Sequence, residues 1–61
     1  MKAVINHGIT YIMSIVCDDD GWALAFNSIH TTDKHRYHYK SLAAVEEAFN
    51  NNLKWYSAKA V

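Results

Sequence analysis

Proline is absent from this 61-residue sequence, and glycine and cysteine are scarce, with two glycines and one cysteine. No segment therefore has the composition of a flexible linker, and we expect a single domain over residues 1–61. A lone cysteine excludes both a disulfide framework and the paired cysteines of a zinc ribbon. We expect Cys17 to be a reduced thiol in a cytoplasmic protein, with an intermolecular disulfide as the alternative.

An excess of charge of either sign is also missing, because six basic and six acidic residues give a formal net charge of zero. Such a chain has no long-range electrostatic steering toward nucleic acid. A long apolar run is lacking too. Polar residues interrupt the apolar segment 1–17, whereas a membrane-spanning helix needs about 20 apolar residues. We therefore expect strand structure in this segment and no contact with a membrane.

Hydrophobic residues nevertheless make up 51% of the chain, and their spacing predicts strands. Residues 9–17 alternate, and one side is continuously apolar while the other is mixed. β-branched and aromatic residues predominate there, which favours a strand over a helix. Alternation resumes over residues 22–26, where a tryptophan, a leucine and a phenylalanine share one face.

The sequence DDDG at residues 18–21 lies between these two alternating runs. Aspartates bond to their own backbone and Gly21 accepts a positive φ, so the motif predicts the turn of a β-hairpin. A metal or phosphate loop is the alternative. The spacing lacks the distal glutamate of a calcium-binding loop and the lysine of a phosphate loop, so we favour the turn.

Residues 35–40, HRYHYK, predict a third strand with tyrosines inward and basic side chains outward. From Ser41 the period changes, because apolar residues then recur at intervals of three and four, as in an amphipathic helix. Ser41 is placed to cap this helix by accepting a hydrogen bond from a backbone amide of the first turn. The helical stripe comprises Leu42, Val45, Phe49, Leu53 and Tyr56.

These elements predict an α+β fold, a three-stranded antiparallel meander followed by one C-terminal helix packed on one face. The expected order is β-β-β-α. We expect the helix to cover the following sheet residues: Tyr11, Met13, Ile15, Trp22, Leu24, Phe26, Tyr37 and Tyr39. The opposite, uncovered face is expected to carry Thr10, Ile12, Ser14, Val16, Ala23, Ala25, Arg36, His38 and Lys40.

Candidate catalytic and metal-binding residues are few. His35 and His38 are three residues apart, so on a strand they point to opposite faces and cannot share one metal ion. Aspartates follow Cys17, and neighbouring carboxylates disfavour a reactive thiolate. We therefore expect no metal, no cofactor and no enzymatic activity.

The order of three strands, a polar turn and the segment YKSLAAVEEAF resembles the three-strand-plus-helix DNA-binding domains of the AP2 and phage-integrase arm-binding type. That resemblance implies nucleic-acid binding through an aromatic-rich sheet. In size and in its lack of motifs, the chain is also similar to small phage or prophage accessory proteins, including anti-defence proteins. This second resemblance implies a protein that covers the surface of a host protein.

We predict a non-catalytic protein-binding module, and a homodimer, because so small a chain leaves a sheet face and aromatic residues uncovered. Tyrosine and tryptophan are common interface anchors. The alternative is a nucleic-acid-binding domain that uses the three-stranded sheet, with basic residues interleaved between tyrosines. The predicted binding residues are Arg36, His38, Lys40, Trp55 and Tyr56.

Overall fold

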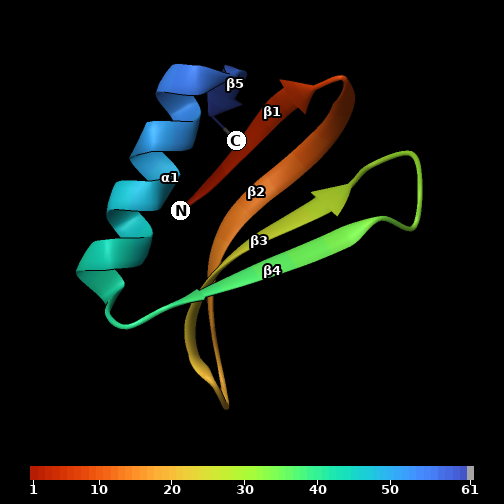
Figure 1. Cartoon of the computed structure of the whole chain (residues 1–61). Helices are drawn as coiled ribbons and strands as arrows, with labels where there is room; N and C mark the ends of the chain where they lie inside the picture. The colour runs from red at the N-terminus through yellow and green to blue at the C-terminus, as the bar shows by residue number, and fades with distance from the viewer. Residues whose placement is uncertain (61) are drawn as a thin grey trace.

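A computed structural model describes residues 1–60 of the chain as a curved antiparallel sheet with one helix against one face (Figure 1). The order of strands across the sheet is β4-β3-β2-β1-β5, and every neighbouring pair is antiparallel. The elements in chain order are β1 (Lys2–His7), β2 (Ile9–Asp18), β3 (Gly21–Ser28), β4 (Lys34–Tyr39), α1 (Leu42–Trp55) and β5 (Ser57–Ala60).

The predicted α+β class with an antiparallel sheet is confirmed, but the predicted number of three strands is wrong. Four strands precede the helix, because the segment expected to be one strand is a hairpin of β1 and β2. Gly8, with φ +74°, reverses the chain between them. Only glycine adopts a positive φ without a steric cost, so one residue suffices for the turn. The short strand β5 follows the helix and pairs with β1.

The motif DDDG forms the turn of the β2–β3 hairpin, as predicted. Asp18 pairs with Gly21 at the end of the ladder. The Asp20 amide donates a hydrogen bond of 2.9 Å to Oδ1 of Asp18, and Gly21 has φ +112°. This local bond is the aspartate turn geometry that the composition predicts.

Helix α1 begins where the sequence predicts it. The Ser41 hydroxyl accepts a hydrogen bond of 3.2 Å from the Ala44 amide, which satisfies one of the free donors of the first turn. The helix ends at Trp55, and Tyr56 is its C-cap, one residue earlier than the apolar stripe suggests. No helix within residues 1–60 is long and apolar enough to cross a membrane.

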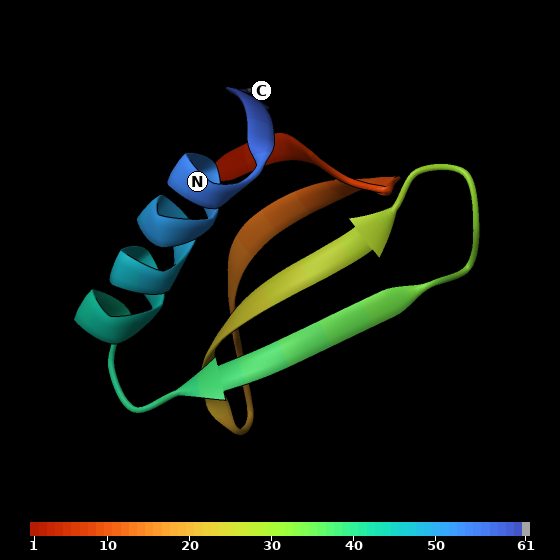
Figure 2. The same cartoon turned by 45° about the horizontal axis from the view of Figure 1, so that its top comes forward.

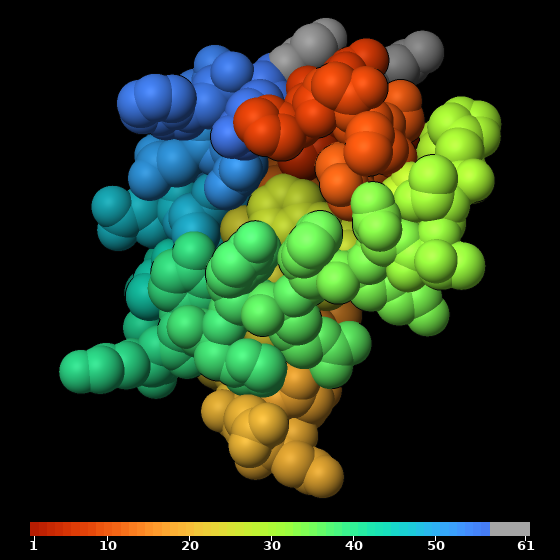
Figure 3. All heavy atoms as spheres, turned by 45° about the vertical axis from the view of Figure 1, so that its right-hand side comes forward, coloured from red at the N-terminus to blue at the C-terminus, as the bar shows by residue number. Residues whose placement is uncertain are grey.

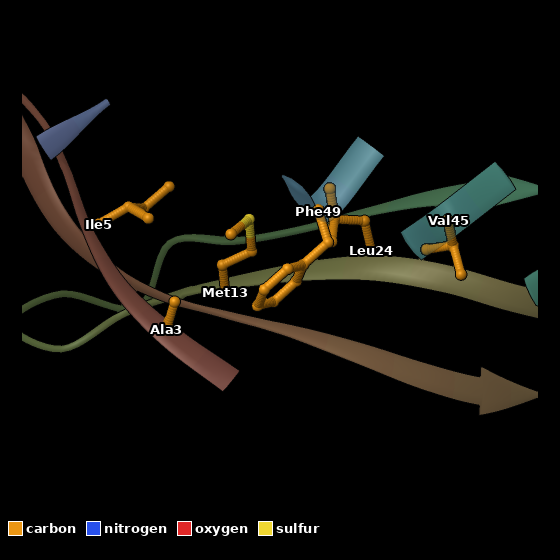
Figure 4. Close-up of a cluster of buried hydrophobic side chains, with 6 residues drawn as sticks. All are labelled: Ala3, Ile5, Met13, Leu24, Val45 and Phe49. Atoms are coloured by element: carbon orange, nitrogen blue, oxygen red, sulfur yellow. The ribbon is translucent and has the colours of Figure 1, made fainter. Parts of the chain in front are cut away.

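The core lies between α1 and the helix-facing side of β1, β2 and β3 (Figure 4). Tyr37 and Tyr39, predicted to be buried, are instead exposed, and so is Leu42. The reason is the position of β4 at the edge of the sheet, where one helix of 14 residues gives little cover. The buried cluster comprises Ala3, Ile5, Met13, Leu24, Val45 and Phe49.

The opposite face of the sheet, which we call the outer face, is covered by no helix within residues 1–60 (Figure 2). Ser14, Ala23 and Ala25 were expected to be uncovered there, but all three are buried. Ala23 lies directly between Val16 and His38 in the ladder. Cross-strand neighbours stand about 5 Å apart, so their longer side chains shield the methyl group.

Candidate functional site

The five predicted binding residues do not form one site. Arg36 and His38 lie together on the outer face, where both contact Asp18. Lys40 follows the end of β4. Trp55 is the last residue of α1 and is 80% exposed, whereas Tyr56 packs against the core on the helix side. The structure therefore separates an outer pair from residues at the end of the helix.

The outer pair is held by Asp18. Nη1 of Arg36 donates a hydrogen bond of 2.8 Å to Oδ2 of Asp18, and Nε2 of His38 lies 3.0 Å from the same oxygen. The hydrogen bond with His38, together with those from Arg36 and the Asp20 amide, lowers the pKa of Asp18 to about 2. The predicted outward basic stripe is therefore partly neutralised by a carboxylate from β2.

Asp18, Asp20 and His38 each offer one possible metal-ligand atom, and these atoms lie within 4.8 Å of one another. The guanidinium of Arg36 already occupies the position of a cation beside Asp18. A metal ion there would face its positive charge at short range, so we assign no metal role to this cluster. His35 and His38 lie on opposite faces of β4, as predicted, since His35 lines the helix side.

A cleft of about 400 Å³ opens on the helix side of the sheet, beside the end of α1. Figure 3 shows the hollow where β4, the end of the helix and the N-terminal strands meet. We call it the aromatic cleft, because tyrosine, phenylalanine and histidine rings make up most of its wall. Its lining residues are Ile5, His7, Tyr11, Leu24, Phe26, His35, Tyr37, Tyr39, Asn52 and Tyr56.

The rings of the aromatic cleft contact one another, mainly edge to face. His7 and Tyr56 lie at one end, with ring centroids 4.4 Å apart and an interplanar angle of 78°. Phe26 and Tyr37 lie 5.8 Å apart at 77°, while His35 is nearly parallel to Tyr37 at 6.5 Å. Such pairs are favourable beyond the area that they bury. The rings of the cleft wall therefore support one another.

The cleft exists because α1 covers the sheet incompletely. The β3–β4 hairpin extends away from the helix (Figures 1 and 2). On the helix, Asn52 does not fill the gap, since its Nδ2 donates a hydrogen bond of 2.8 Å to the Ala48 carbonyl of its own helix. Tyr37 thus remains 53% exposed on a face that the helix covers elsewhere.

Sequence reasoning predicted Tyr56 as a binding residue but missed the cleft that Tyr56 lines. The alternation of His35, Tyr37 and Tyr39 placed these rings on the correct face of the sheet. We then expected the helix to bury the tyrosines, because periodicity gives the direction of a side chain and not the extent of its cover. His7 was missed because the β1–β2 hairpin was not predicted.

Comparisons with protein-family profiles, with curated proteins and with solved structures find no match to this chain. Its function is therefore inferred from the geometry of the chain itself.

Proposed function

We propose that this chain is a non-catalytic protein-binding module that uses the aromatic cleft to hold side chains of a partner. The observation that carries the proposal is the open row of packed rings, which includes the exposed Tyr37 and Tyr39. Tyrosines provide large contact areas at low conformational cost and are frequent interface anchors. Trp55, 80% exposed and adjacent to Tyr56 in the chain, supplies a second anchor.

The histidines of the cleft support binding rather than catalysis. His7 packs against Tyr56, and His35 lies against the rings of Tyr11 and Tyr37. A catalytic base needs a hydrogen-bond partner that orients it and a proton within reach. The contacts of these two imidazoles are with aromatic rings, which suits a wall that packs against a ligand.

The proposed biological role is that of a small accessory protein that covers part of a host protein, in a cytoplasmic setting. The likeness to phage and prophage accessory proteins in size and in the lack of motifs motivates this role. A cleft of about 400 Å³ can hold one or two side chains of a partner. Binding to a partner's surface requires no catalytic step, and a domain of 61 residues is large enough to cover part of such a surface.

Capture from a host lysate, followed by mass spectrometry, tests this function. We expect the wild-type chain to retain a protein that Tyr37→Ala fails to retain. Ile29→Ala is the matched control, because Ile29 is similarly exposed but does not line the cleft. Trp55→Ala tests the second anchor. Equal capture of the same protein by wild type and by Tyr37→Ala would show that the cleft is not the binding site.

Nucleic-acid binding is the second candidate, and the exposure of Tyr37 and Tyr39 favours it because bases stack on such rings. The pairing of Asp18 with Arg36 and His38 reduces the positive charge of the outer face. Titration of a fluorescent single-stranded oligonucleotide at low salt distinguishes nucleic-acid binding from protein binding. Affinity that falls steeply with added salt supports this candidate, whereas no binding at low salt excludes it.

A further inference from the structure

Strand β4 forms one edge of the sheet, and all six of its residues are exposed. Within residues 1–60, it pairs with β3 on one side only. An edge strand presents a row of free amides and carbonyls, to which another extended chain can add. The edge of β4 borders the aromatic cleft, because three of its rings line that cleft.

The register shows which amides of β4 are free. The Ser28 amide donates a hydrogen bond of 2.9 Å to the Asp33 carbonyl, and the next pair in the ladder is Asn27 with Lys34. Bonded and non-bonded pairs alternate along an antiparallel ladder. The amides that bond to β3 are therefore those of His35, Tyr37 and Tyr39, and those that point to the free edge belong to Lys34, Arg36 and His38.

The side chains along this edge are basic. Residues 34–40 contain Lys34, Arg36 and Lys40 and no acidic residue, and Asp33 lies in the preceding turn. Asp18 pairs with Arg36. Among the side chains that the structure describes, no ion pair joins Lys34 or Lys40, and these two lysines lie at opposite ends of the strand.

Building on the proposed function, we propose that the partner adds an extended acidic segment to β4 as an antiparallel sixth strand. Backbone bonds form with Lys34, Arg36 and His38. The residue of the segment opposite Lys34 lies on the outer face and is acidic, since opposite charges across a ladder are favourable, and a further acidic residue lies near Lys40 beyond the end of the strand. The alternate residues point to the helix side, where apolar side chains pack against Tyr37 and Tyr39 in the cleft.

A second copy of this chain is a poor match for this edge, because residues 34–40 supply no acidic side chain. Pairing two β4 edges brings Lys34 and Lys40 of each copy to an edge that is itself basic, while Arg36 already binds Asp18 of its own chain. Like charges directly opposite one another destabilise a ladder. Charged edge residues are a common means of preventing such self-pairing. Charge complementarity therefore selects an acidic partner.

The test uses the full, ¹⁵N-labelled chain and synthetic peptides of nine residues in three designs, four peptides in all. The first alternates glutamate with valine or phenylalanine. The second has lysine in place of each glutamate, and the third is the acidic peptide with N-methyl groups on alternate amides, prepared in both registers. Titrations followed by NMR give the affinities, and amide hydrogen exchange reports which backbone donors become protected.

We expect the acidic peptide to bind at least about fivefold more tightly than the basic one, with loss of binding for the N-methyl peptide in one register. The amides of Lys34, Arg36 and His38 should gain protection on binding. Those of His35, Tyr37 and Tyr39 should be protected already in the free chain. The double variant Lys34→Glu/Lys40→Glu should reverse the preference and favour the basic peptide.

Failure of the inference is distinguishable from failure of the proposed function. Equal binding of both N-methyl peptides, or no protection at Lys34, Arg36 and His38, would overturn strand addition. A lack of binding by the unmethylated acidic peptide would also overturn strand addition. In each case the proposed function stands if the captured protein still depends on Tyr37. Loss of that dependence overturns the proposed function instead.

Discussion

The imidazole of His38 in β4 lies 3.0 Å from a carboxylate oxygen of Asp18 in β2, although β3 separates the two strands. The outward residues of β3 at this point are Gly21, Ala23 and Ala25, the ladder neighbours of Asp18, His38 and Arg36. Because these residues are small, side chains from the flanking strands meet above them. The contact between Asp18 and His38 thus links the β2–β3 turn to the edge strand.

Protonation of Asp18 is predicted to destabilise the fold at low pH. Its bond with His38, and then that with Arg36, lowers the pKa in the folded state from 3.8 to about 2. The unfolded chain therefore binds more protons between these values, so the stabilisation is present above about pH 4 and is lost as pH falls to about 2. Urea unfolding of wild type and Asp18→Asn at several pH values measures this.

Asp18→Asn should have a lower free energy of unfolding than wild type at pH 6, and this difference should become small at pH 2. Asp19→Asn is the control in the same turn. An equal difference between Asp18→Asn and wild type at both pH values would show that the ionised carboxylate is not responsible.

Removal of the helix cap should lower the free energy of unfolding by about 1 kcal/mol. In Ser41→Ala, the Ala44 amide loses the hydroxyl that accepts its hydrogen bond. Ser41→Asp should retain most of the stability, since a carboxylate accepts the same bond and interacts favourably with the helix N-terminus. Urea denaturation followed by circular dichroism is the measurement. Equal losses in both variants would contradict a capping role.

Two leucines should respond differently to truncation. Leu24 is 1% exposed and belongs to the core cluster, so Leu24→Ala should destabilise the chain by about 3 kcal/mol through lost burial and a cavity. Leu42, 40% exposed at the start of α1, should lose less than about 1 kcal/mol on the same change. Thermal and urea unfolding measure both variants. Comparable losses would mean that Leu42 is buried against the sheet, as the sequence predicted.

The homodimer expected from the sequence stays a prediction, and the outer face is its proposed interface. Ile12 is half-buried there, beside the small residues Ser14 and Ala25. Ile12→Lys should shift the protein to monomer in sedimentation velocity, since a charge at a dimer interface is costly. Ile9→Lys, a change in the same strand on the other face, is the control. A wild-type chain that sediments as a monomer at millimolar concentration would overturn the dimer.

The local elements were largely predictable because short-range chemistry determines them. The alternation around Met13 and Leu24, the DDDG turn and the Ser41 cap all depend on residues within a few positions of one another. Gly8 carried the signal for the missed hairpin. A single glycine inside an apolar run indicates a turn only if the segments on both sides of it pair within a sheet. The first segment, β1, pairs with β5, whose residues lie more than 50 positions later in the chain than their partners in β1.

The sequence by itself determined the α+β class, the faces of the strands and the start of the helix, since these follow from side-chain periodicity and local hydrogen bonds. The tertiary structure decided where the helix lies on the sheet. That placement leaves Tyr37 exposed, opens the aromatic cleft and leaves the edge of β4 free. It also joins Asp18 to His38 across β3, because distances between strands depend on the whole sheet and are not encoded in any one segment.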